Sequence, residues 1–300
     1  MSKKRKIFYG LGLLATSTVV YVSFQQFFVA NAKAVAASVH VIEGQGGNIG
    51  VSAGDDGIFM IDDQYAPMTD SIRKSLVAIS DRPLRFILNT HWHEDHTGGN
   101  ENFGKAGTVI VAHDNVRTRM STEQFIKAWD KKVSPSPAAA LPVVTFTETV
   151  TFHFNGDEIH VFHVPPAHTD GDSLVHFRKA DVLHMGDTFF NGLYPFIDLS
   201  SGGSVSGTIA AADRGLALAG PKTRIIPGHG SMAGKAELQA YRDMLATVRD
   251  RIAAAVKAGK TLQEIQATQP TAEWDAAWGN GFRTPAAFAE NVYEGIKSAT

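Results

Sequence analysis

The sequence of 300 residues contains no cysteine. This absence excludes disulfide bonds, thiolate metal ligands and anchoring through a lipid-modified N-terminal cysteine. The formal net charge is only −2, so the chain also lacks the surplus of basic residues with which nucleic-acid-binding proteins contact phosphates. We therefore expect no nucleic-acid partner. The sequence gives no indication of an oligomeric state.

The one basic run, Lys3-Lys4-Arg5-Lys6, precedes a mostly apolar stretch over residues 7–22, and Ala32-Lys33-Ala34 fits the small-x-small pattern of a signal-peptidase site. We expect residues 1–34 to be a secretory signal peptide and the protein to be periplasmic or secreted. Residues 7–30 are also long enough to span a bilayer. An uncleaved inner-membrane anchor is therefore the alternative, and it is the only membrane contact that we expect.

Beyond residue 34, strand and helix patterns alternate without internal repeats. This alternation predicts one α/β domain over residues 38–300, with sheets inside, helices outside and a helical extension at the C-terminus. Strands are expected over 37–44, 48–54, 57–63, 85–90, 107–113, 173–177 and 181–187, and as a hairpin within 144–164 around Asn155-Gly156-Asp157. Helices are expected over 66–80, 115–130 and 238–256.

The segment NTHWHEDHTGGN, residues 89–100, holds three of the 12 histidines of the chain within six positions. His91, His93 and Asp95 alternate, so an extended backbone would point them to one side, and His96 could join them after a turn. Imidazole and carboxylate groups are ligands for zinc and similar divalent ions. A solvated polar loop is the alternative, but the preceding apolar strand and the following Gly98-Gly99 pair favour a metal site. The two glycines should let the backbone turn tightly.

Three further residues are candidate metal ligands. His168 in PPAHTDGDS, Asp187 in HMGDTFF and His229 in IIPGHGS each follow a predicted strand. Functional side chains concentrate on such loops in layered α/β proteins.

The HWHEDH motif, followed in order by His168, Asp187 and His229, resembles the metallo-β-lactamase superfamily over about residues 38–260. The resemblance implies a four-layer αββα sandwich of two mixed sheets flanked by helices. The ligand set is most similar to that of glyoxalase II, the lactonases and related esterases.

The resemblance also assigns roles to individual residues. It implies two divalent ions, zinc in the first place, with iron or manganese as alternatives because the same ligands serve all three. Asp62, which closes an apolar strand, would support the ligand loop. Apart from the resemblance, the position of Asp172 in HTDGDS predicts a hydrogen bond to a ligand. One ion would be held by His91, His93 and His168, the other by Asp95, His96 and His229, with Asp187 bridging.

These assignments predict an exported dinuclear zinc hydrolase that cleaves an ester, thioester, lactone or lactam of a small molecule through a metal-bound hydroxide. Asp95 would also be catalytic, because it could orient the hydroxide or accept a proton from it. No serine or cysteine nucleophile is required.

Two other functions stay open on the same fold, a mono-iron oxygenase acting on a sulfur substrate and a β-lactamase proper. Phe190 occupies the position at which some lactamases have a lysine that binds the antibiotic carboxylate. The complete ligand set argues against the oxygenase and against a binding protein without catalysis. Phe190 and Tyr194, on the aromatic loop after Asp187, are candidate substrate-binding residues, although such rings also pack cores.

Overall fold

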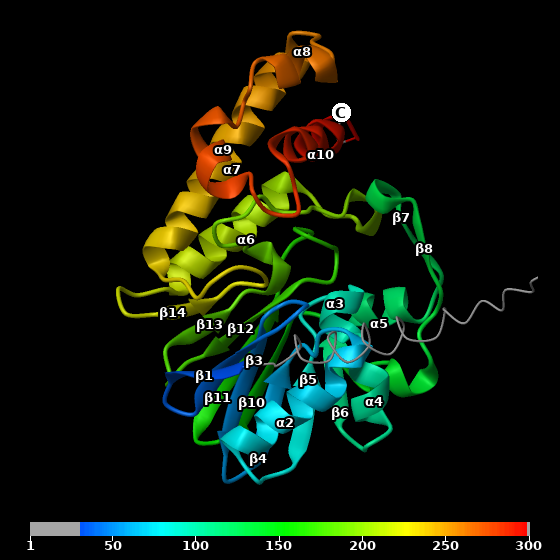
Figure 1. Cartoon of the computed structure of the whole chain (residues 1–300), viewed down its shortest axis with the longest axis vertical. Helices are drawn as coiled ribbons and strands as arrows, with labels where there is room; N and C mark the ends of the chain where they lie inside the picture. Colours follow the sequence, from blue (N-terminus) through cyan, green and yellow to red (C-terminus); the bar gives the residue numbers. More distant parts are fainter. Residues whose placement is uncertain (1–30, 299–300) are drawn as a thin grey trace, which may run out of the picture.

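The computed structural model describes residues 31–298, and in it two β-sheets pack face to face (Figure 1). The seven-stranded sheet has the order β1-β2-β3-β4-β5-β6-β9, with antiparallel pairs from β1 to β4 and parallel pairs from β4 to β9. Its strands are β1 Asn31–Ala36, β2 Val39–Glu43, β3 Ile49–Gly54, β4 Gly57–Ile61, β5 Leu84–Leu88, β6 Val109–His113 and β9 Val144–Phe146.

The five-stranded sheet has the order β10-β11-β12-β13-β14, antiparallel except for the parallel pair of β13 and β14. A separate two-stranded hairpin pairs β7 with β8. The strands are β10 Thr149–Phe154, β11 Asp157–His163, β12 Ser173–Phe177, β13 Val182–His184, β14 Arg224–Ile226, β7 Gln124–Ile126 and β8 Lys131–Val133.

Strand β4 shows how the layers form, because all five of its residues are buried. Successive side chains of a strand point to opposite faces of its sheet. Phe59 and Ile61 pack between the two sheets, against residues of β11 and β12 such as Val161. Ile58 and Met60 pack on the other face. A strand buried on both faces in this way lies inside a layered sandwich.

Helices cover the outer face of each sheet. Ile72 and Leu76 of α2 pack on the seven-stranded sheet, whereas α6 and α7 pack on the five-stranded sheet and are covered in turn by the C-terminal helices (Figure 1). The molecule is therefore the expected four-layer αββα sandwich. The helices are α2 Thr69–Ile79, α3 Glu94–Thr97, α4 Asn100–Gly104, α5 Asp114–Met120, α6 Val205–Leu218, α7 Lys235–Lys257, α8 Leu262–Ala267, α9 Ala272–Trp278 and α10 Pro285–Ser298.

The expected helix over 115–130 is wrong in its second half. Helix α5 ends at Met120, and the chain then forms the β7–β8 hairpin, whose turn places Asp130 in the left-handed region at φ 49°. Within the hairpin Ile126 is buried, while Phe125 and Trp129 are exposed. These apolar residues do not form one helical face, so no core contact favours a longer helix.

The segment 144–164 also differs from the expected hairpin, because it contains a third strand, β9, which pairs with β6 in the other sheet.

Strand β1 overlaps the segment that the sequence assigns to export. Residues 1–30 of the expected signal peptide or anchor lie outside the described residues, but Ala32, Lys33 and Ala34 lie in β1 and pair with β2. The Lys33 ammonium also contacts the Glu43 carboxylate at 2.5 Å. Residues 31–34 are thus part of the sheet. Within residues 31–298, no helix combines the length and apolar character needed to cross a membrane.

Candidate metal centre

The candidate ligands lie on four loops that follow strands β5, β11, β13 and β14. His91 and His93 follow β5, and Asp95 and His96 belong to the single turn of α3. His168 follows β11, Asp187 lies in a short 3-10 helix after β13, and His229 follows β14. Among residues 31–298, three groups of possible ligands have their ligand atoms within 4.8 Å of one another, and their members are the seven ligands predicted from the sequence.

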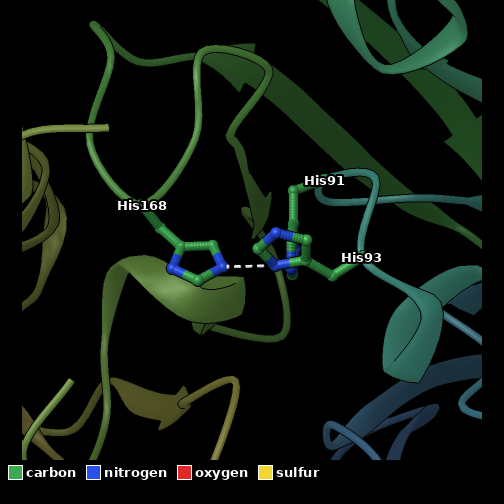
Figure 2. Close-up of side chains that lie close together, drawn as sticks. All are labelled: His91, His93 and His168. Carbon is green, nitrogen blue, oxygen red and sulfur yellow. Dashed lines mark hydrogen bonds between the residues drawn. The ribbon is translucent and has the colours of Figure 1, made fainter. Parts of the chain in front are cut away.

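The first triad consists of His91, His93 and His168, whose rings point toward one another from two separate loops (Figure 2). His93 Nδ1 lies 2.8 Å from His168 Nε2. His91 Nε2 is buried and has no hydrogen-bond partner among the described residues. A buried polar atom without a partner is costly, so these nitrogens fit a shared ligand that accepts their lone pairs, as a divalent ion does.

The second triad consists of Asp95, His96 and His229. His229 Nε2 lies 3.1 Å from Asp95 Oδ2 and 3.4 Å from His96 Nε2. Two of these side chains are partly exposed, Asp95 by 23% and His229 by 22%. Carboxylate and imidazole ligands again suit a divalent ion.

Asp187 lies between the triads. Its Oδ2 is 3.5 Å from His168 Nε2 and 3.5 Å from His229 Nε2, and its Oδ1 is 3.0 Å from His96 Nε2. That Oδ1 atom is buried without a hydrogen-bond partner among the described residues. One carboxylate that faces both triads has the position required of a bridging ligand.

The second nitrogen of four ligand rings is held by a neighbouring group. His91 Nδ1 lies 3.1 Å from Thr90 Oγ1, His96 Nδ1 2.8 Å from Asp62 Oδ2, His93 Nε2 3.0 Å from Asp198 Oδ2 and His168 Nδ1 2.7 Å from the Phe196 carbonyl oxygen. Such contacts fix the orientation of a ring and leave its other nitrogen for the metal.

The two triads differ in their proton affinity. Burial holds the pKa of His91 well below its usual value and lowers that of His168 to about 4, so both rings are neutral. Burial also disfavours the charged form of His229, but the Asp187 and Asp95 carboxylates together outweigh burial and raise the pKa of His229 to about 9. The neighbouring carboxylates, Asp187 first, also raise the pKa of His96 well above its usual value despite its burial. Burial would raise the pKa of Asp95, but His96 and His229 together outweigh burial and lower this pKa to about 2.

The centre opens into a cavity of about 620 Å³. His93, His168 and Asp187 reach it from the floor, and Trp92 and Phe196 stand beside them. The β7–β8 hairpin and the following loop also line the cavity, through residues that include Ile126, Trp129, Lys131, Val133 and Pro135. This volume lies within the range of cavities that bind small molecules.

The two predicted supporting carboxylates lie beside the ligands. Asp62 accepts hydrogen bonds from the Thr90 N–H at 2.7 Å and the Thr90 hydroxyl at 2.8 Å, in addition to its contact with His96. Asp172 accepts the His168 N–H at 2.6 Å, and burial raises the pKa of Asp172 to about 7.

The two predicted substrate-binding residues are fully buried. The Phe190 ring stacks on His229 with centroids 5.3 Å apart. The Tyr194 hydroxyl donates to Asp275 Oδ1 at 2.8 Å, away from the centre. Neither residue is among those that line the cavity.

The local conformation around the HWHEDH motif differs from the expected one. The alternation ends at His93, because the α3 turn begins at Glu94 and carries Asp95 and His96. Gly98 has a φ of −65°, which any residue can adopt. A Cβ atom on Gly98 would lie 2.8 Å from the Gln64 carbonyl oxygen, so a glycine is needed there for close approach of two loops.

Asp198 is a supporting residue that the sequence did not reveal. It is buried, and its Oδ1 accepts hydrogen bonds from Ser200 at the start of a short 3-10 helix while its Oδ2 reaches His93. Burial would raise the pKa of Asp198, but the contact with His93 outweighs burial and holds the pKa well below its usual value. The only sequence signal, an aspartate before two serines, is typical of a helix cap.

Two curated relatives match parts of the chain. The 2,4-dinitroanisole O-demethylase subunit alpha of Nocardioides sp. (strain JS1661) is 26% identical over 147 residues, which cover 46% of this chain and 40% of that protein. The hydroxyacylglutathione hydrolase of Pelagibacter ubique (strain HTCC1062) is 28% identical over 109 residues, covering 36% and 37%. The matches thus span about two fifths of the length of these relatives.

Solved structures share the fold at low sequence identity. A stereoselective inverting sec-alkylsulfatase from Pseudomonas sp. matches with a TM-score of 0.64 at 17% identity over 88% of this chain and 50% of the sulfatase. The DIM-1 metallo-beta-lactamase matches with a TM-score of 0.59 at 17% identity over 73% of this chain and 97% of the lactamase.

The profile of the metallo-beta-lactamase superfamily matches residues 34–229, which contain all seven candidate ligands. Most members of this superfamily are metal-dependent hydrolases, and some are oxygenases. With its αββα sandwich and its histidine and aspartate cluster on loops that follow strands of both sheets, the chain belongs to the metallo-beta-lactamase superfamily.

Proposed function

We propose that this protein is a hydrolase that holds two divalent ions, zinc in the first place, and cleaves an ester, thioester, lactone or lactam of a small molecule. The observation that carries the proposal is the pair of triads with Asp187 between them, each with its ligand atoms within 4.8 Å of one another. The named relative from Pelagibacter ubique is a hydrolase, which supports the reaction class.

The residues of the centre have two roles, metal binding and proton transfer. His91, His93 and His168 would hold one ion, and Asp95, His96 and His229 the other. Bound divalent ions lower the pKa of water and polarise a substrate carbonyl. Asp95 is ionised at neutral pH and lines the cavity, so its carboxylate can also orient an attacking water and accept its proton.

The completeness of the second triad favours two ions over one. A mono-iron oxygenase needs fewer ligands than the seven that converge here, and His229 and Asp95 would have no role in it. We infer no substrate from the relatives named as sulfatase, lactamase and O-demethylase, because they share only 17–26% identity with this chain.

Export to the periplasm is the second part of the proposal. It rests on the basic run, the apolar stretch and the small-x-small pattern of residues 1–34. N-terminal sequencing of the protein recovered from a periplasmic extract tests it, and an intact Met1 on a protein that fractionates with membranes would favour the anchor instead.

Elemental mass spectrometry of the full chain, purified without a histidine tag, is the deciding experiment. Two zinc ions per chain, with hydrolysis of an aryl ester, thioester, lactone or lactam that a chelator abolishes, would support the proposal. One iron per chain and oxygen consumption with a thiol or persulfide would replace it with the oxygenase. Two bound ions with no hydrolysis across all four classes would count against the reaction.

A further inference from the structure

Two exposed aromatic rings line the cavity beside the metal centre. Trp129, at the turn of the β7–β8 hairpin, is 48% exposed, and Phe282, in the loop between α9 and α10, is 56% exposed. Large aromatic side chains usually bury their surface. Their exposure at the same cavity, from segments about 150 residues apart in the sequence, indicates that a ligand covers them.

Each of the two rings lies next to a different triad. Trp129 lies 6.5 Å from the His93 ring of the first triad, and Phe282 lies 6.2 Å from the His229 ring of the second triad (centroid distances). A group bound between Trp129 and Phe282 would therefore lie over both metal positions.

Phe196 contacts both Trp129 and the loop that carries Phe282. The Trp129 ring stacks on Phe196 at 4.5 Å with an interplanar angle of 29°. The Arg283 guanidinium, adjacent to Phe282, lies 5.4 Å from the Phe196 ring centroid, and Arg283 also donates to the Ala287 carbonyl oxygen at 3.2 Å. Because a half-buried cation and a buried ring fix the loop, Phe282 is held beside the cavity.

The charges of the cavity wall are balanced. Arg119 is bound by Asp170 through two contacts of 2.6 and 2.7 Å, and Lys131 contacts Glu94 at 2.8 Å. Apart from the metal ligands, the charged lining residues are the cations Arg119 and Lys131 and the carboxylates Glu94 and Glu101. The wall therefore provides no surplus positive charge to hold an anionic part of a substrate.

We propose that Trp129 and Phe282 form an aromatic pair that binds a flat, uncharged aromatic group of the substrate and sets the specificity of the enzyme for neutral aryl substrates. The inference rests on the proposed hydrolase, because it places the scissile bond over the metal centre. It concerns binding, however, and can be measured without hydrolysis.

The test uses 2-acetonaphthone, a neutral ketone that resembles an aryl ester but cannot be hydrolysed. Its dissociation constant is measured by isothermal titration calorimetry on the zinc-loaded full chain and on the Trp129→Ala and Phe282→Ala variants. We expect each substitution to weaken binding by on the order of tenfold, since one aromatic contact and its buried area are lost. Zinc content should remain that of the unmodified protein.

Phe125→Ala is the matched control. Phe125 lies on the same hairpin as Trp129 and is 52% exposed, but it does not line the cavity. Its substitution should leave ketone binding within about twofold of the original value. Equal weakening in all three variants, or no binding to the unmodified protein, would overturn the aromatic pair.

The charge of the substrate is tested with 6-acetylnaphthalene-2-sulfonate, which adds a weakly metal-binding anion to the same ketone. We expect it to bind at least tenfold more weakly than 2-acetonaphthone. Equal or tighter binding would refute the preference for neutral substrates. Intact ketone binding in a protein that hydrolyses no ester would contradict the proposed function and leave the aromatic pair standing.

Discussion

The two triads of the metal centre are chemically unlike, although they share Asp187. The first consists of three histidines, all at least 95% buried, and the pKa values of His91 and His168 are lowered. The second pairs His96 and His229 with two carboxylates, and the pKa values of both histidines are raised. Without metal, His91 and His168 are therefore neutral ligands, whereas the second position holds protons that an ion must displace.

Removal of Asp187 should have the largest effect, because it is the one ligand that both positions share. We expect Asp187→Ala to lower metal content below two ions per chain and hydrolysis by more than about 100-fold, the upper end of the effect of residues that only support ligands. Metal analysis and turnover on one preparation measure this. Unchanged metal content and rate would mean that Asp187 does not bridge.

The supporting carboxylates allow the two positions to be weakened unequally. Asp198→Asn disturbs His93 of the first triad. Asp62→Asn disturbs His96 of the second triad directly, and His91 only through Thr90. Each should reduce the affinity of its own position by about 10- to 100-fold. Competition titration with a chromophoric chelator resolves the two constants, and a loss confined to the same position in both variants would contradict the assignment.

Acid should empty the second position before the first. Below about pH 9, His229 carries a proton in the metal-free protein, so the apparent affinity should fall at least tenfold per pH unit as pH decreases. His168 stays neutral down to about pH 4, so this ligand releases no proton between pH 6 and 8, and the first constant should fall less steeply with pH than the second. Metal titrations at pH 6, 7 and 8 test this. The same pH dependence for both binding constants would contradict the difference in proton affinity between the triads.

His153→Ala should have the smallest effect. His153 is exposed on β10 and belongs to neither triad. Metal content and turnover should equal those of the unmodified protein. A loss of metal in this variant would show that an external histidine contributes to the centre.

The sequence locates the candidate ligands because the loops that carry them follow apolar strands. The pattern of apolar segments therefore places His168, Asp187 and His229 without knowledge of the fold, and their assignment to a metal stays a prediction. The packing of two sheets between helices follows from the family resemblance and not from the strand pattern itself.

The features that the sequence misses depend on contacts between distant segments. Asp198 reaches His93 across 105 positions, and Trp129 and Phe282 meet the same cavity only in the folded chain. Phe190 and Tyr194 are instead buried. Composition alone cannot distinguish an aromatic residue on a cavity wall from one in the core, because both kinds of site favour the same side chains.

Strand β1 contains the cleavage site that the sequence predicts. Cleavage after Ala34 would remove the four residues that pair with β2 from Glu43 to His40. The backbone N–H and C=O groups along that side of β2 would then form an open sheet edge, on which another extended chain can pair. A chain that retains Asn31 protects this edge within its own fold, whereas a chain cut after Ala34 would have an edge available for association with a second copy.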